Sequence, residues 1–198
     1  MGQWGAETSL VSKKPSFDPT VLHQERVAVL NAVVGFGLEG YSHQVSRSLF
    51  NALSANCPVV KSVSPQEALS RINRAGLAKD YATMMAEYVH SGIMDRTVLE
   101  QVGQAIPAGY VFQPSMAAFS QQMSGRLSFL GLRIFQTRVS MLRLSLQLWD
   151  ARSGEIVWEA SGEATLSGED VREFRIPFEH IAERLWQRIL QDLQLGGE

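Results

Sequence analysis

The stretch RVSMLRLSLQLWDARSGEIVWEASGEATL, residues 138–166, carries the clearest strand signal in the chain. Apolar and polar residues alternate through its first half, and this two-residue period predicts a strand with one buried face. The apolar positions are Leu142, Leu144, Leu146 and Leu148. In the second half, Ile156, Trp158 and Ala160 share a face, which predicts a returning strand. Together the two halves predict an antiparallel hairpin.

The turn of this hairpin, DARSGE at residues 150–155, has residue types that suit a tight connection. We expect the Asp150 carboxylate to accept hydrogen bonds from backbone amides of its own turn. Gly154 is expected to adopt the left-handed conformation that a hairpin bulge requires. Both residues are therefore assigned a structural role. The charged side chains of Arg152 and Glu155 are candidates for specific contacts with a partner protein.

Upstream of the hairpin, strand and helix signals alternate. The continuous apolar run at residues 25–34 predicts a strand buried on both faces. Apolar residues three or four apart predict an amphipathic helix over residues 38–55, and residues 57–63 predict a second strand. The sequence SPQE at residues 64–67 is typical of a capping box with a proline at the first helical position. These signals predict a β-α-β unit followed by a further helix.

The remaining segments complete an α+β chain. The helix after residue 64 is expected to break near Gly76 and stop at Gly92, and another helix is expected to begin at Asp95. Residues 110–122 predict a strand that Pro114 bends or confines to an edge. Residues 178–193 predict a terminal helix.

The predicted order is β-α-β-α-α-β-β-β-α, with a mixed β-sheet, a C-terminal antiparallel hairpin and helices packed on the sheet. The polar stretch at residues 1–22 is expected to be a flexible leader, and residues 23–198 a single α+β domain.

Composition narrows the function classes. The chain has 198 residues, of which 45% are hydrophobic and 19% charged, so it can build an ordinary core. A net charge of -2 does not favour nucleic acid as a partner. The single cysteine, Cys57, excludes an internal disulfide. The histidines lack the spacing of metal ligands, so we predict no metal and no cofactor.

A glycine motif offers an alternative function. The stretch VVGFGLEGYS, residues 33–42, spells G-x-G-x-x-G with Gly35, Gly37 and Gly40, and it lies between a strand and a helix. In a dinucleotide-binding fold such glycines let a pyrophosphate approach a helix N-terminus. The chain lacks the repeated β-α units and the acidic ribose partner of that fold. We therefore expect a strand-to-helix turn and keep nucleotide binding by this loop as the alternative.

Several stretches together resemble one family of bacterial envelope lipoproteins. They are RVAVLNAV, SRSLFNALSA, PVVKSVSPQEA, the hairpin RVSMLRLSLQLWDARSGEIVWEASGEA and FEHIAERLWQRILQDL, within about residues 25–195. In this order they are similar to the curli-secretion-channel lipoproteins, the penicillin-binding-protein-activator lipoproteins and the N-terminal domain of the Tol-system propeller protein. The resemblance implies a mixed sheet with helices packed on it.

The same resemblance implies a non-enzymatic protein. It implies a lipid-anchored module on the periplasmic side of the outer membrane that helps assemble, secrete or regulate an envelope complex through protein contacts. Met1 then stands where such lipoproteins carry their lipidated cysteine. The protein is then expected to contact the membrane only through that lipid. It is also expected to be able to self-associate. Candidate contact residues are Trp4 in the leader, and Phe129 and Phe135 between the strands.

An oligomeric secretion-channel subunit is a further alternative implied by the resemblance. Channels of this family insert long amphipathic hairpins into the membrane. The corresponding segment here, SGRLSFLGLRIFQTR at residues 124–138, is short, and no second insert is evident. The sequence therefore favours a binding module over a pore.

Overall fold

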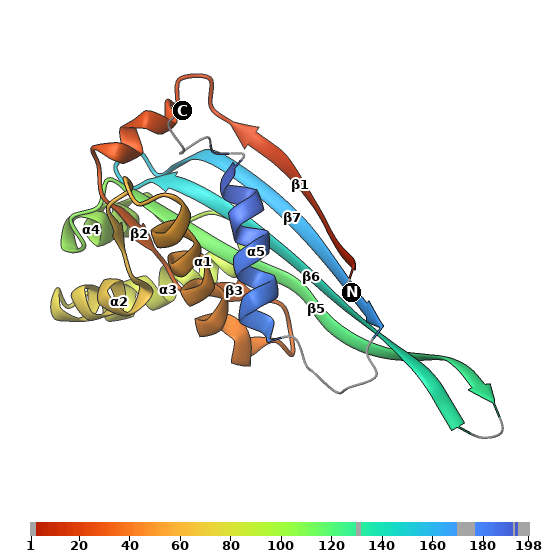
Figure 1. Ribbon diagram of the computed structural model, residues 1–198. Coiled ribbons are helices and arrows are strands. Elements are labelled where there is room, and N and C mark those ends of the chain that lie inside the picture. The colour runs from red at the N-terminus through yellow and green to blue at the C-terminus, as the bar shows by residue number, and fades with distance from the viewer. Residues whose placement is uncertain (1–2, 130–131, 170–176, 192, 194–198) are drawn as a thin grey trace.

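The computed structural model describes residues 3–129, 132–169, 177–191 and 193, and shows a mixed sheet with helices on both faces (Figure 1). The sheet has seven strands in the order β1-β7-β6-β5-β2-β4, with β3 also paired to β5. Strands β1, β7, β6 and β5 run antiparallel, whereas β2, β3 and β4 pair in parallel. The strands are β1 (Gln3–Lys13), β2 (Val27–Val29), β3 (Val33–Val34), β4 (Ser62–Val63), β5 (Tyr110–Phe129), β6 (Leu132–Asp150) and β7 (Glu155–Glu169). The predicted α+β class is confirmed.

Two groups of helices cover the two faces of the sheet. Helices α1 and α5 pack together on one face, whereas α2, α3 and α4 contribute to a separate core on the other (Figure 1). Short 3-10 turns precede β2 and α1. The helices are η1 (Pro19–His23), η2 (Glu39–Tyr41), α1 (Ser42–Asn56), α2 (Pro65–Arg74), α3 (Ala78–Ser91), α4 (Arg96–Ala105) and α5 (Phe178–Gln191).

The predicted hairpin forms between β6 and β7, and its leucine row lies under α1 and α5. The four alternating leucines of β6 are almost completely buried in one core cluster. Gly162 on β7 lets α5 approach closely, because a Cβ there would lie 2.9 Å from Leu185 Cδ1 and 3.1 Å from Ile189 Cγ1. The small residues of β7 thus make room for the helix that closes this core.

Strand β2 is buried on both faces, as predicted. Val27 and Val29 belong to the core under α1 and α5, whereas Ala28 and Leu30 belong to the core under α2, α3 and α4. The predicted strand over residues 25–34 is nevertheless split into β2 and β3. Between them, the amide of Ala32 donates to Ser46 Oγ (2.7 Å) and its carbonyl accepts from Ser42 Oγ (2.6 Å). Side chains of α1 thus replace the sheet hydrogen bonds of Ala32.

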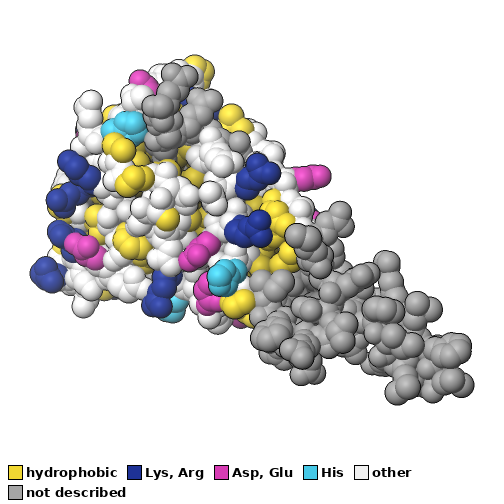
Figure 2. All heavy atoms as spheres, viewed as in Figure 1, with side chains coloured by type: hydrophobic (Ala, Val, Ile, Leu, Met, Phe, Trp, Pro, Cys, Tyr) yellow, Lys and Arg dark blue, Asp and Glu magenta, His cyan; other side chains and the backbone are white. Residues whose placement is uncertain are grey.

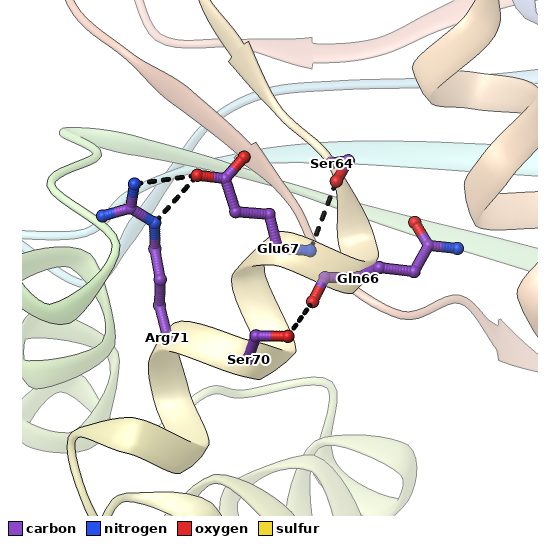
Figure 3. A network of polar contacts seen from close by, with 5 residues as sticks. All are labelled: Ser64, Gln66, Glu67, Ser70 and Arg71. Atoms are coloured by element: carbon purple, nitrogen blue, oxygen red, sulfur yellow. Dashed lines mark hydrogen bonds and ion pairs between the residues drawn. The ribbon is translucent and has the colours of Figure 1, made fainter.

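The start of α2 follows the predicted capping sequence in part. Ser64 Oγ accepts a hydrogen bond from the Glu67 amide (3.2 Å), and Pro65 is the first helical residue (Figure 3). The Glu67 carboxylate does not return to the backbone of Ser64. It accepts instead from Arg71 Nη2 (2.8 Å), one turn along the helix. Only half of the capping box is therefore formed.

The structure differs from the predicted flexible leader. Residues 3–13 form the edge strand β1, which pairs antiparallel with β7 from Gln3 opposite Ser167 to Lys13 opposite Trp158. Trp4 and Ala6 pack against the core. The strand was missed because most of its residues are small or polar, so its inward face carries too few apolar side chains for a clear period-two signal.

The strands β5 and β6 are longer than predicted. Their register continues to Phe129 opposite Leu132, beyond the point where Thr137 pairs with Glu169 at the end of β7. The resulting ribbon extends past the helices (Figure 1). β5 is also an internal strand, not an edge. Pro114 is tolerated there because it falls between the β5 residues that pair with β2 and those that pair with β3.

Candidate functional site

The glycine motif forms a tight turn at the end of β3. The Gly35 amide donates to the Met116 carbonyl (2.9 Å), and the Leu38 amide donates to the Gly35 carbonyl (3.0 Å). Gly37 has a φ of 80°, which is what the third position of a type II turn requires. Gly35 is close to β5, since a Cβ there would lie 3.1 Å from the Ala117 carbonyl oxygen. Backbone geometry thus accounts for these two glycines.

Three backbone amides of this turn, those of Gly35, Gly37 and Leu38, are already engaged. The Gly37 amide donates to Glu39 Oε1 (3.1 Å), and hydrogen bonds from the backbone amides of Glu39 and Gly37 lower the pKa of the Glu39 carboxyl. An ionised carboxylate at the amide of the central glycine repels a phosphate. This geometry does not favour nucleotide binding, which stays an alternative prediction from the sequence. Gly40 lies in open space, where a Cβ would meet nothing within 4 Å.

Phe36, at the tip of the turn, was not among the predicted contact residues. Its relative exposure is 103%, whereas the other exposed large apolar side chains reach 50–68%. The sequence held a signal for it, because a residue between two glycines of a turn has few neighbours to pack against. The structure shows that the turn holds this ring away from the body of the protein.

Trp4 connects β1 to α5. The indole packs against the core, and the Arg184 guanidinium carbon lies 4.5 Å from its ring centroid, within cation–π range. The ring is half-buried. This geometry gives Trp4 a structural task, and a role in binding a partner remains a prediction.

The predicted turn of the hairpin is formed, and its charged residues have partners within the chain. Asp150 Oδ1 accepts from the amides of Arg152 (2.8 Å) and Ser153 (3.2 Å), and Gly154 has a φ of 70°. Arg152 Nη2 lies 2.9 Å from Glu25 Oε1, and this hydrogen bond raises the pKa of the guanidinium. Lys14 Nζ lies 2.5 Å from Glu155, and this hydrogen bond lowers the pKa of the carboxyl.

Three predicted positions fall outside what can be described. Phe129 lies in β5 and Phe135 in β6, but their side chains are outside the described part of the chain, and so is Met1. The backbone register places Phe129 opposite Leu132 and Phe135 opposite Leu127, near the end of the ribbon. Their roles as contact residues remain predictions.

A row of serines crosses the face of the sheet opposite α1 and α5. The strand registers place Ser115, Ser145, Ser161 and Ser9 side by side on β5, β6, β7 and β1. Ser115 and Ser145 hydroxyl oxygens lie 2.6 Å apart, and those of Ser161 and Ser9 lie 3.1 Å apart. The alternation in the sequence indicated a polar face, but only the register shows that four strands contribute to one row.

The serine row is bordered by longer polar side chains. On one side Arg143 Nη2 pairs with Glu163 Oε2 (2.6 Å), and on the other Gln147 Oε1 accepts from Tyr88 Oη of α3 (2.7 Å). These groups hydrogen-bond to each other, and no nucleophile–base pair is evident among them.

The described part of the chain shows neither a metal centre nor a membrane span. Among residues 3–129, 132–169, 177–191 and 193, no three His, Cys, Asp or Glu side chains are grouped so that they could hold a metal ion. Within those ranges, no helix has the length and apolar character needed to cross a membrane.

Figure 2 shows acidic and basic side chains interspersed on the visible face.

Comparison with known proteins finds likeness in structure alone. No family model and no curated protein matches the sequence. The PelC dodecamer from Paraburkholderia phytofirmans is similar at a TM-score of 0.54 and 16% identity, over 100% of both chains. A variant of that dodecamer gives 0.51 and 16% identity, over 94% of this chain and 98% of that one. Lipoprotein GNA1162 from Neisseria meningitidis gives 0.49 and 13%, over 87% and 99% respectively. At these identities the PelC likeness shows a shared fold.

Proposed function

We propose that this chain is a non-catalytic binding module of the bacterial envelope that assembles with copies of itself and contacts partner proteins of an envelope complex. The observation that carries the proposal is the likeness to PelC, a protein that forms a dodecamer, over the full length of both chains. The order of sequence motifs resembling envelope lipoproteins supports the compartment. We further propose that a lipid at the N-terminus anchors the protein in the membrane and that the folded domain faces the periplasm.

The surface of the sheet is consistent with contact between proteins. Its serine row is lined with side chains that donate and accept hydrogen bonds, and the Arg143–Glu163 ion pair beside it is exposed. Polar surfaces of this kind are common in non-obligate interfaces. The charged residues of the hairpin turn, Arg152 and Glu155, lie at one end of β6 and β7, where a partner can reach them.

Metabolic labelling with a radioactive or alkyne-bearing fatty acid tests the compartment. We expect that the protein expressed from its native gene in its own host incorporates the label. We also expect that only detergent releases the labelled protein from the membrane fraction. Protein without label that stays in the soluble fraction would contradict the envelope assignment. Self-assembly is tested separately by the mass of the purified protein in solution.

A further inference from the structure

Strand β1 forms one edge of the sheet. It is the last strand on its side of the strand order, and among the described residues it pairs only with β7 (Figure 1). Half of the backbone amides and carbonyls of an edge strand point away from its neighbour, so this edge offers a row of hydrogen-bond donors and acceptors. The opposite edge is β4, which spans only Ser62–Val63. Of the two edges, that of β1 is the one long enough to pair with a further strand over several residues.

The first part of β1 lacks the features that usually discourage pairing at an edge. Natural edge strands are commonly protected by lysine, by proline or by a bulge. Residues 3–10 contain no lysine, arginine or proline, and their register with β7 is regular from Gln3 to Leu10. The bulge and Lys13 come only after that stretch. Residues 3–10 are therefore an edge that is open to strand addition.

The single charged residue of this stretch, Glu7, lies in an unfavourable place. It is opposite Glu163 on the face that carries the serine row, and like charges directly opposite each other on neighbouring strands are destabilising. Glu163 Oε2 pairs with Arg143 Nη2 (2.6 Å). The Glu7 side chain, in contrast, has neither an ion pair nor a hydrogen bond with any described residue. A cation supplied by another molecule would relieve this repulsion.

A recess lies beside these two carboxylates, at the edge of the sheet. It is lined by Gly5, Ala6, Glu7, Glu163 and Thr165. Because Gly5 has no side chain, a long side chain opposite it on an added strand can lie across it toward the carboxylates. Diagonal neighbours on adjacent strands are within reach of such side chains. Lysine and arginine combine this length with the charge that the recess lacks.

The other face of β1 suits an apolar side chain on the added strand. Leu10 lies opposite Ala160, which belongs to the core under α1 and α5, but Leu10 itself is 50% exposed. An apolar side chain next to Leu10 would remove part of that surface from water. The two faces of β1 thus suit a segment with basic and polar side chains on one face and apolar side chains on the other. That alternation is the period of a strand.

We infer that the edge of β1 binds an extended segment of a partner protein, which adds a strand to the sheet and places a lysine or arginine in the recess lined by Glu7 and Glu163. The inference rests on the proposed function, since it gives the class of segment through which the module contacts a partner. In this mode backbone hydrogen bonds supply affinity and side chains supply specificity. The basic residue also sets the register, because a slip by one residue would turn it to the other face.

Two synthetic peptides test this binding mode on the purified full chain. One alternates threonine and valine and carries lysine in place of its central threonine, and the other carries glutamate at that position. We expect the lysine peptide to shift the amide NMR signals of residues 3–10. We also expect it to bind about tenfold more tightly than the glutamate peptide, because attraction to two carboxylates is replaced by repulsion. No binding of the lysine peptide at millimolar concentration, or shifts confined to another element, would overturn the inference.

Charge reversal at position 7 gives an independent readout. Glu7→Lys should remove the preference for the lysine peptide. Glu87→Lys, on the exposed side of α3, changes the net charge equally and is the matched control, which should keep that preference. Circular dichroism should show an unaltered fold for both variants, because both side chains are exposed. An undiminished preference in Glu7→Lys would overturn the inference.

These outcomes are distinct from those that test the proposed function, because peptide binding requires neither a lipid nor a second copy of the chain. If the native protein incorporates fatty acid and self-assembles but the lysine peptide does not bind at β1, the inference fails while the proposed function stands. If the lysine peptide binds at β1 but the native protein carries no lipid and stays in the soluble fraction, the envelope assignment fails while the strand-addition site stands.

Discussion

Gly37 and Gly40 lie three residues apart in one motif, but their backbones make different demands. A Cβ at either position would meet nothing within 4 Å, but Gly37 has a φ of 80°, whereas Gly40 shows no positive φ. We expect Gly37→Ala to lower the free energy of unfolding by about 1 kcal/mol, because the left-handed conformation strains a Cβ. Gly40→Ala should change it much less. Urea unfolding followed by circular dichroism measures both, and equal effects would contradict the turn assignment.

Buried tyrosines predict how the fold responds to alkali. Desolvation raises the pKa of Tyr81 and Tyr88 to about 12 from an ordinary value of 10.0. Below pH 10 both hydroxyls are protonated in the folded and unfolded states. Between about pH 10 and 12 the unfolded chain loses these protons while the folded chain keeps them, so stability falls as pH rises. Urea midpoints at a series of pH values should show this fall, and Tyr81→Phe should make it shallower.

For single residues, the sequence predicts a role in a turn more readily than a role in contact with a partner. Asp150 and Gly154 could be assigned from residue type, because Asx turns and left-handed glycines follow local rules. The place of Phe36 between two glycines of a turn signals an exposed ring, but the extent of its exposure depends on how the rest of the fold packs around the turn. Arg152 was predicted to contact a partner protein, and its ion pair with Glu25 is identified only by the fold, because the two residues are distant in the chain.

Helix α2 offers a test of capping at the scale of one element. Ser64→Ala removes the acceptor for the Glu67 amide (3.2 Å) and should lower the free energy of unfolding by about 1 kcal/mol. Ser70→Ala is the matched control, since Ser70 Oγ only donates to the Gln66 carbonyl within the helix (Figure 3). Thermal unfolding in parallel measures both. A loss at position 70 equal to that at position 64 would count against the cap.

The contact between α5 and β7 tests the packing of the main core. A valine at position 162 would drive two methyl groups into Leu185 and Ile189, which already lie 2.9 Å and 3.1 Å from the Cβ position. We expect Gly162→Val to destabilise the protein by about 1–3 kcal/mol through overpacking. Gly5→Ala is the control, because its nearest neighbour would lie at 3.8 Å, an ordinary contact. Denaturant midpoints of the two variants should differ clearly.

The elements most visible in the sequence were those with a strong hydrophobic period. The alternating leucines of β6 and the apolar stripe of α5 each predict which face of the element is buried, because the spacing of apolar residues matches the period of a strand or a helix. Strand β1 was not predicted because it is held by hydrogen bonds to β7, and the pattern of its own side chains gives no clear strand signal. The division between β2 and β3 was also hidden, because it depends on Ser42 and Ser46 reaching back to Ala32 from the following helix.

For the whole molecule, the proposed binding role depends on the surfaces that the fold presents. A mixed sheet covered by α1 and α5 on one face presents a serine row on the other, and the glycine motif ends in an exposed aromatic ring. The proposed function uses both as surfaces for contact with other proteins. The sequence predicted the layers of this fold, but the surfaces depend on strand register and on side chains that remain uncovered after folding.

The mass of the purified wild-type chain in solution tests the proposed self-assembly most directly. Size-exclusion chromatography with multi-angle light scattering, over a range of protein concentrations, should give a mass several times the 21.9 kDa of one chain. That mass should fall toward one chain on dilution, as mass action requires. A mass of 21.9 kDa at every concentration, with the fold intact by circular dichroism, would contradict the account.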